Sequence, residues 1–222
     1  SQMLKLIHLT GMEKSMKNQY QNASNISARI QLHNKYSTNT QGWFPGSLIN
    51  ATWQNIRPFL RLAAVMVLYG LKIKKKFQNS FNVVLSDISE GMLRDARREI
   101  GVRDKRFYFQ TADACKIPYE DDMFDVVTAN HVLFYCEDIG RVCGEIRRVL
   151  KPGGIFVCGA YGSSHMKEVS QLVQKFDEHI ILSAEHLYER FGKENGRGIL
   201  DPYFEQIEWR QYEDYLVVPE PE

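Results

Sequence analysis

The sequence predicts an α/β protein with a doubly wound, mainly parallel sheet and an antiparallel hairpin at the C-terminal sheet edge. From residue 82 onward, short apolar runs alternate with segments whose apolar residues recur every three or four positions, which indicates strands alternating with helices. After residue 205, apolar residues alternate on both sides of one polar break, 212–215, which is typical of two hairpin strands.

The first clear unit begins at residue 82. Residues 82–86 form a continuous apolar run between polar residues, which suits a strand covered on both faces. Ser89 can cap the helix that follows. Its apolar side chains recur at helical spacing and are Met92, Leu93, Ala96 and Ile100. Residues 107–109 are the next expected strand.

The second unit begins with an expected strand over residues 124–129. A helix follows, with a regular apolar stripe between Ile139 and Leu150. Lys151-Pro152-Gly153-Gly154 ends this helix, because proline cannot continue it and glycine supplies a left-handed turn. Residues 155–158 are then a strand, and residues 166–180 an amphipathic helix.

Length and composition indicate one soluble globular domain with additions. The chain has 222 residues, 44% of them hydrophobic and 25% charged. Residues 1–40 are polar and rich in Asn, Gln and Ser, with a modest helical stretch, so we expect an N-terminal helical extension or lid there. Residues 41–222 then form the main domain.

The charge balance and the cysteine pattern exclude several classes of partner. With 28 Lys and Arg against 27 Asp and Glu, no overall field favours nucleic acid or an anionic membrane. The longest uncharged apolar run, 62–71, is about half as long as a membrane span. The four cysteines, Cys115, Cys136, Cys143 and Cys158, form no C-x-x-C pair or metal-ligand spacing. We therefore expect reduced thiols, no metal and a cytoplasmic protein.

Polar residues just after the expected strands are the candidate site, because ligands of such sheets bind beyond the carboxyl ends of the strands. Asp87 can accept both ribose hydroxyls of an adenosine, and can also cap the helix beginning at Ser89. Asp113 can accept the adenine amino group, although a surface turn acid would look identical. Asn130 and His131 follow the fourth strand, where a substrate would meet a methyl or hydride donor. His131 is the candidate catalytic acid or base.

Four stretches, in this order, resemble the successive motifs of class I S-adenosylmethionine-dependent methyltransferases. They are 84–93, Asp113-Ala114 with Ile117-Pro118-Tyr119, 124–127 and 148–154. The resemblance implies a seven-stranded Rossmann-like methyltransferase fold and S-adenosylmethionine as cofactor. It also implies that Asp87 binds the ribose, Asp113 binds the adenine amine, and Ile88 and Ala114 flank the adenine. Asn130 is placed with the cofactor-binding residues.

The family's first motif, a glycine-rich loop after the first strand, has no counterpart in this sequence. Residues 46–80 contain only two glycines. When the codons are regrouped by a shifted frame, residues 57–69 can encode Ser-Ile-Leu-Glu-Ile-Gly-Cys-Gly-Asn-Gly-Ser-Leu-Trp. A compensated frameshift over about residues 46–74 is therefore predicted. In the sequence as it stands, Ala63 and Ala64 occupy the places of the loop's Cys and second Gly, and any remaining cofactor contact is expected there.

The resemblance implies in-line attack of an acceptor nucleophile on a sulfonium methyl, for which a general base is optional. His131, Tyr20 and Tyr36 are the candidate bases. The stretch 130–133 differs from the Asn-Pro-Pro-Tyr pattern of enzymes that methylate amino groups of bases and glutamine, which favours a small-molecule acceptor. Two alternatives stay open: an inactive methyltransferase-fold binding protein, and a nicotinamide-dependent oxidoreductase, which would however show G-x-G-x-x-G before Asp87.

Overall fold

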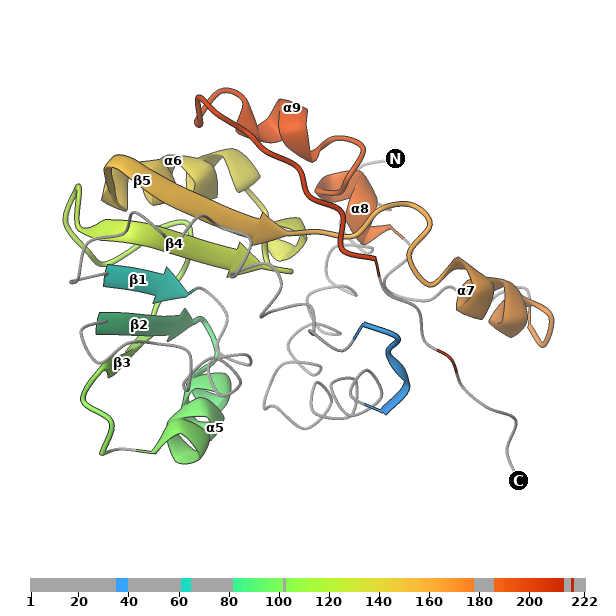
Figure 1. The fold of residues 1–222 in the computed structure, drawn as a ribbon, viewed down its shortest axis with the longest axis horizontal. Helices are drawn as coiled ribbons and strands as arrows, with labels where there is room; N and C mark the ends of the chain where they lie inside the picture. Colours follow the sequence, from blue (N-terminus) through green and yellow to red (C-terminus); the bar gives the residue numbers. More distant parts are fainter. Residues whose placement is uncertain are drawn as a thin grey trace, which may run out of the picture.

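The computed structural model describes residues 35–39, 61–64, 82–101, 103–177, 186–213 and 217. Within these ranges, five strands form one parallel sheet in the order β3-β2-β1-β4-β5 (Figure 1). The strands are β1 (Arg61–Ala64), β2 (Asn82–Asp87), β3 (Phe107–Thr111), β4 (Phe124–Asn130) and β5 (Leu150–Gly159). The predicted parallel sheet is therefore confirmed, whereas the full count of seven strands is not.

Helices connect the strands and follow the last one. They are α5 (Glu90–Ile100), the 3-10 turn η3 (Leu133–Tyr135), α6 (Ile139–Val149), α7 (Lys167–Gln174), α8 (Leu187–Arg190) and α9 (Gly196–Leu200). The crossover from β2 to β3 runs away from β1 in one direction, and the crossover from β4 to β5 runs away in the other. Because such crossovers are right-handed, α5 and α6 lie on opposite faces of the sheet.

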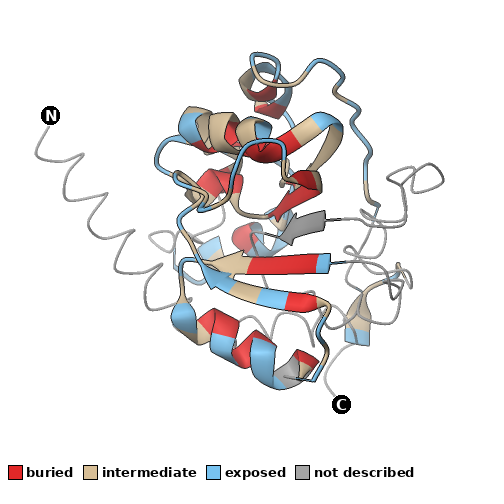
Figure 2. Cartoon of the chain, turned by 90° about the vertical axis from the view of Figure 1, so that its left-hand side faces the viewer, coloured by how far each residue is buried: buried red, intermediate tan, exposed pale blue. Residues whose placement is uncertain are grey.

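Helix α5 forms as its apolar spacing predicts. The hydroxyl oxygen of Ser89 accepts a hydrogen bond of 3.3 Å from Met92 N, which makes Ser89 the N-cap. The helix ends at Gly101, whose φ of +88° favours glycine. The predicted stripe is buried, and Figure 2 shows this side of the helix turned to the sheet.

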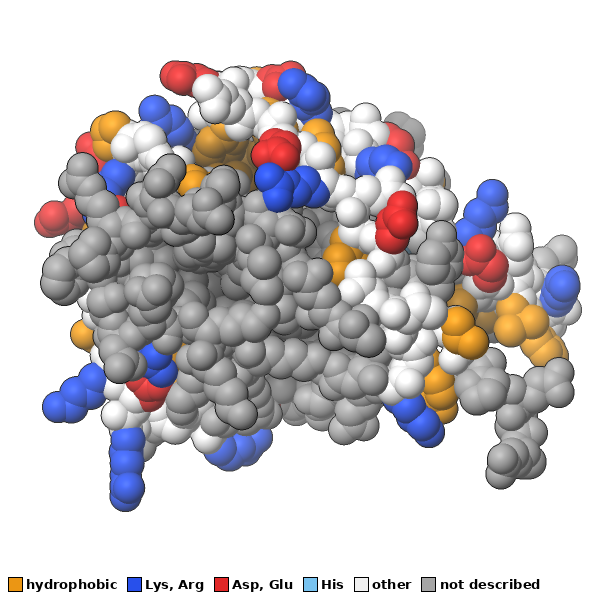
Figure 3. Space-filling model, in the orientation of Figure 1, with side chains coloured by type: hydrophobic (Ala, Val, Ile, Leu, Met, Phe, Trp, Pro, Cys, Tyr) orange, Lys and Arg blue, Asp and Glu red, His pale blue; other side chains and the backbone are white. Residues whose placement is uncertain are grey.

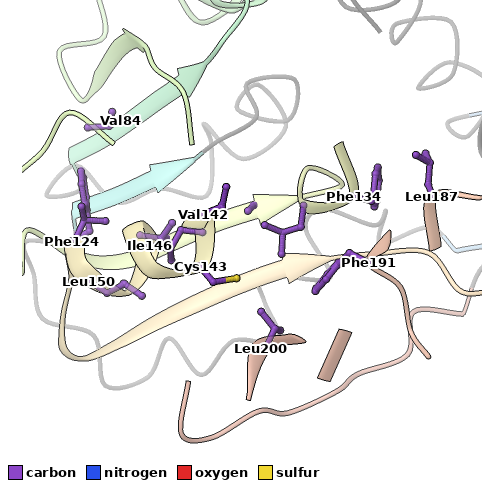
Figure 4. Packing of buried hydrophobic residues seen from close by; sticks show 14 residues of the cluster. Val84, Phe124, Phe134, Val142, Cys143, Ile146, Leu150, Leu187, Phe191 and Leu200 are labelled. Carbon is purple, nitrogen blue, oxygen red and sulfur yellow. The ribbon is translucent and has the colours of Figure 1, made fainter. Parts of the chain in front are cut away.

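Helix α6 anchors the main hydrophobic core. Asp138 caps it by accepting a 2.8 Å hydrogen bond from Arg141 N. The helix ends at Val149, before the predicted stop at 151–154, and Leu150, which was predicted to belong to its stripe, begins β5. Val142, Cys143 and Ile146 belong to a buried cluster with residues of β4, η3, α8 and α9 (Figure 4). Gly153 adopts the expected left-handed conformation, with φ of +74°, but it lies inside β5, which begins at Leu150.

Two predictions about the second half of the chain are not confirmed. Helix α7 ends at Gln174, so the helix expected over 166–180 is shorter by residues 175–177, and 178–180 lie outside the described residues. Residues 205–213 and Val217 lie in no strand, so the described part of the C-terminal segment shows no hairpin. Instead, Val217 N donates to Tyr36 O at 2.9 Å, and Asn39 Nδ2 donates to Glu213 O at 2.9 Å.

The C-terminal segment thus contacts residues 35–39, the described part of the predicted N-terminal extension. The division into an extension over 1–40 and a main domain over 41–222 stays a prediction. No helix in the described ranges is both long and apolar enough to cross a bilayer. Apolar side chains are exposed on one face of α7 and just beyond its end, at Val169, Leu172 and Phe176 (Figure 3).

Candidate functional site

The predicted site residues meet at one edge of the sheet. Because all five strands are parallel, their carboxyl ends lie on the same side. Asp87 is the last residue of β2 and Asn130 the last of β4, while Asp113 follows the end of β3 by two positions. The strand order reverses between β1 and β4, which is where ligands of open α/β sheets bind.

The Asp87 carboxyl group lies at the turn from β2 into α5. Its Oδ1 accepts a 2.8 Å hydrogen bond from Ser89 N, and its carbonyl oxygen accepts from Ala112 N at 3.1 Å. Burial raises its pKa to about 6, although backbone hydrogen bonds from Ser89 and Ile88 oppose the rise. The carboxyl group is therefore partly desolvated, and hydrogen bonds that favour its charged form would bring the pKa down again.

The adjacent Ile88 is a large apolar residue that is 73% exposed. Across the sheet edge, Asp113 Oδ1 accepts from Cys115 N at 2.8 Å, and its carbonyl oxygen accepts from Lys116 N at 3.0 Å, so this aspartate organises its own turn. Ala114 packs against the hydrophobic core. The two residues predicted to flank the adenine are thus apolar groups beside two carboxylates, Asp87 and Asp113.

Asn130 carries a buried amide with no hydrogen-bond partner among the described residues. The residue is 2% exposed, and within the described ranges neither Oδ1 nor Nδ2 has a partner. Leaving buried polar groups unpaired costs about 1 to 3 kcal/mol for each group, so such groups in native proteins require an explanation. An amide of this kind at the carboxyl end of β4 fits a ligand that supplies its hydrogen bonds.

His131 is held in an unusual backbone conformation. Its φ of +56° is uncommon for a residue other than glycine, and its backbone N–H donates to Gly159 O at 3.0 Å. The imidazole ring stacks on Tyr161 with centroids 4.4 Å apart, and Tyr161 stacks on His165 at 4.0 Å. Tyr161 and His165 were not predicted, although Tyr161 stands two positions after the end of β5 and could have been found by the rule that identified His131.

The remaining predicted contacts are placed differently or lie outside the described residues. Ala63 and Ala64 lie inside β1, paired with Val84 and Leu85 of β2, and not in a loop. Only 61–64 of the predicted frameshift region 46–74 are described, so the frameshift stays a prediction. Tyr20 lies outside the described residues, and Tyr36 is half-buried beside the C-terminal segment.

The cysteines behave as the sequence predicted. All four are free thiols, and burial raises the pKa of Cys136 to about 12 and that of Cys143 to about 11. Such thiols stay protonated and unreactive near neutral pH. In the described ranges no three His, Cys, Asp or Glu side chains are grouped in a way that could hold a metal ion.

Comparisons with known proteins point to one kind of domain. Residues 68–158 match the methyltransferase domain family, and the match begins after β1. A demethylmenaquinone methyltransferase of Clavibacter sepedonicus is 44% identical over 78 residues, which are 35% of this chain and 31% of that protein. A ubiquinone/menaquinone biosynthesis C-methyltransferase of Acidiphilium cryptum is 38% identical over 96 residues, 42% of this chain and 39% of that protein.

A malonyl-(acyl-carrier protein) O-methyltransferase of Nitrosospira multiformis is 30% identical over 127 residues, 50% of this chain and 41% of that protein. The matches therefore span less than half the length of these three relatives. Among solved structures, a methyltransferase in complex with the Haloferax volcanii Trm112 methyltransferase activator has a TM-score of 0.52 at 20% identity, covering 71% of this chain and 65% of that chain. This likeness supports the Rossmann-like methyltransferase fold.

Proposed function

We propose that this chain is a class I S-adenosylmethionine-dependent methyltransferase and transfers a methyl group from S-adenosylmethionine to a small-molecule acceptor. The observation that carries the proposal is the amide of Asn130, which is buried where the strand order reverses and has no hydrogen-bond partner in the described part of the chain. A bound cofactor and acceptor would supply the hydrogen bonds that this amide lacks.

The residues at the sheet edge fit the adenosine part of the cofactor. Asp87 would accept the ribose hydroxyls, and Asp113 would accept the adenine amine. The exposed Ile88 side chain and Ala114 would cover the two faces of the base, which would remove Ile88 from water. Ala63 and Ala64, in the central strand, would approach the methionine end through their backbone.

When bound, S-adenosylmethionine supplies an electrophilic methyl group on a cationic sulfur, with a neutral thioether as leaving group. The protein then needs chiefly to align the acceptor and exclude water. Asn130 would orient the acceptor nucleophile through its amide. His131, fixed by its stack on Tyr161, would take up the proton that a protonated nucleophile must lose.

The names of the relatives support a small-molecule acceptor. They refer to demethylmenaquinone, to ubiquinone and menaquinone biosynthesis, and to malonyl-(acyl-carrier protein). The sequence difference from the Asn-Pro-Pro-Tyr pattern supports the same class. A cytoplasmic location agrees with the four free thiols.

Titration calorimetry with S-adenosylhomocysteine, the demethylated product, tests this function. We expect binding, and a rise in the melting temperature at saturating ligand, because a ligand that binds only the native state stabilises it by mass action. Binding of NADH without any binding of S-adenosylhomocysteine at millimolar concentration would overturn the proposal.

An inactive binding protein is the second candidate, because β1 carries Ala63 and Ala64 where the family places its Cys and second Gly. The two candidates differ in turnover. An enzyme produces S-adenosylhomocysteine from S-adenosylmethionine when a mixture of small-molecule acceptors is added, and His131→Asn lowers that rate. A binding protein holds the ligand and gives no product above the rate without protein.

A further inference from the structure

Three charged residues of α6 form a row along one side of the helix. Arg141, Glu145 and Arg148 are spaced at i, i+4 and i+7, which places them on neighbouring turns of one face. All three contact residues 113–121, the loop that follows β3, which we name the β3 loop. This loop begins with Asp113 and Ala114, the proposed adenine contacts.

Arg148 holds the second half of the β3 loop. Its Nη1 donates to Tyr119 O at 2.8 Å, and its Nη2 donates to Ile117 O at 3.0 Å. The guanidinium also pairs with Asp121 at 2.8 Å. Backbone carbonyl groups at two positions of the loop are thus fixed by one side chain from α6.

Glu145 fixes both Arg148 and the loop. Its Oε1 accepts from Arg148 Nε at 2.8 Å and its Oε2 from Arg148 Nη2 at 2.9 Å, a two-point contact that sets the plane of the guanidinium. Glu145 Oε2 also accepts from Ile117 N at 2.8 Å. The hydrogen bonds with Arg148 lower the pKa of Glu145 most, and the one from Ile117 N lowers it further. The carboxylate therefore stays charged at neutral pH.

Arg141 connects the row to the adenine contacts. Its Nε donates to Cys115 O at 3.0 Å, and the backbone N–H of the same Cys115 donates to Asp113 Oδ1 at 2.8 Å. Inside the loop, a β-bridge joins Asp113 and Lys116, and Tyr119 N donates to Ile117 O at 2.8 Å. The position of the Asp113 carboxylate therefore depends on a peptide group that α6 holds in place.

We propose that Arg141, Glu145 and Arg148 are positioning residues that set the selectivity of the site for adenine, by fixing the β3 loop against α6. The inference rests on the proposed function, since it assumes that Asp113 and Ala114 meet the base. It goes further in assigning base selectivity to side chains that do not themselves reach the ligand.

The test compares adenosine with inosine, in which a carbonyl oxygen replaces the amino group. Both nucleosides lack the methionine part, so the missing glycine-rich loop does not influence the result. Binding constants are measured by ligand-observed NMR for the parent, for Arg141→Ala and for Arg148→Lys. Arg147→Ala is the matched control, because Arg147 is an exposed arginine of the same helix turn that forms no hydrogen bond or ion pair with the β3 loop, all of whose residues are described.

We expect the parent to prefer adenosine about tenfold, the equivalent of one good hydrogen bond. The preference should fall to about twofold or less in Arg141→Ala and Arg148→Lys, and stay unchanged in Arg147→Ala. A general loss of stability would weaken the binding of both nucleosides equally and leave the ratio of their binding constants unchanged. If Arg148→Lys does not fold, the exposed Arg141 with its single backbone bond still provides the measurement.

An unchanged preference in a folded Arg141→Ala variant would overturn the inference and leave the proposed function standing. A parent protein that binds neither nucleoside, nor S-adenosylhomocysteine, would overturn both. The two failures are therefore distinguishable by the behaviour of the parent alone.

Discussion

The backbone N–H of Ser89 donates a 2.8 Å hydrogen bond to Asp87 Oδ1, while the Ser89 hydroxyl oxygen accepts from Met92 N. Ser89 is therefore the N-cap of α5, and Asp87 stabilises the turn that precedes the helix. The sequence left two roles open for Asp87, ribose binding and capping of α5. The capping role belongs to Ser89, two positions further along the chain. This separation allows stability and ligand binding to be tested by different substitutions.

Asp87→Asn should make ligand binding independent of pH. The pKa of Asp87 lies above its usual value, so its contribution to stability is fully present below pH 3.8 and is lost as the pH rises through about 6. Ribose hydroxyls donate to the charged form, so ligand binding should improve with pH over the same range. We expect the parent to bind S-adenosylhomocysteine about tenfold more weakly at pH 5 than at pH 7, measured by calorimetry. Equal pH dependence in parent and variant would exclude Asp87 as the ribose ligand.

Ser89→Ala should lower the stability of the fold and leave ligand binding almost unchanged. Loss of the N-cap hydroxyl should destabilise the fold by about 0.5 to 2 kcal/mol. The backbone N–H that donates to Asp87 is retained, so affinity for S-adenosylhomocysteine should change by less than about twofold, well under the loss expected for one hydrogen bond. Urea unfolding and calorimetry on the same preparation check the two halves. A variant that melts normally but binds weakly would mean that the hydroxyl itself contacts the ligand.

Asn130→Leu should stabilise the free protein and impair its binding. Replacing an unpartnered buried amide by an apolar side chain of similar size should raise the free energy of unfolding by about 1 to 3 kcal/mol. The ligand would lose its hydrogen bonds to the amide. Urea denaturation with and without S-adenosylhomocysteine measures both effects. Thr128→Val, another buried polar position of β4, is the control and should leave affinity unchanged. A destabilised Asn130→Leu protein would show that the amide has partners within the free protein.

Restoring the glycine-rich motif should strengthen binding by about two to four decades, because two regained backbone donors to the methionine carboxylate are each worth roughly 1.5 to 3 kcal/mol. The variant carries Ser-Ile-Leu-Glu-Ile-Gly-Cys-Gly-Asn-Gly-Ser-Leu-Trp over residues 57–69. Affinity for S-adenosylhomocysteine is compared with that of the chain as it stands, after mass spectrometry of both proteins. Equal affinities would show that the backbone of Ala63 and Ala64 already forms the contact.

The elements that the sequence predicted correctly are those whose apolar pattern is buried. In α5, the apolar residues Met92, Leu93, Ala96 and Ile100 are buried where the helix contacts β2 and β3, so their helical spacing marks a real interface. In α7 a similar spacing of apolar residues led to a wrong prediction of where the helix ends. Leu172 and Phe176 are exposed, so their side chains provide no packing that would stabilise the helix beyond Gln174. The predicted hairpin failed in the described residues for a related reason, since alternation does not identify the partner strand.

The site was predictable where a residue's position in the fold determines its role. Asp87 and Asn130 end strands of a parallel sheet. Because the carboxyl ends of parallel strands lie at one edge, the two residues can be placed there without any knowledge of contacts. The row from Arg141 to Arg148 was not found, because the helical spacing of charged side chains does not show which loop they contact. Ala63 and Ala64 occupy the places of loop residues in the family pattern, but they lie in β1, which pairs with β2 and β4.

The hydrogen bonds between residues 36–39 and the C-terminal segment join positions that are at least 174 residues apart along the chain. Closing a free loop of that length costs roughly 5 kcal/mol, whereas two such bonds return about 1 to 3 kcal/mol together. They can therefore form only after the sheet has brought the two segments near each other. Because the two hydrogen bonds contribute less free energy than loop closure costs, these segments can separate without opening the sheet. Their amides should therefore exchange with solvent before those of β2 and β4.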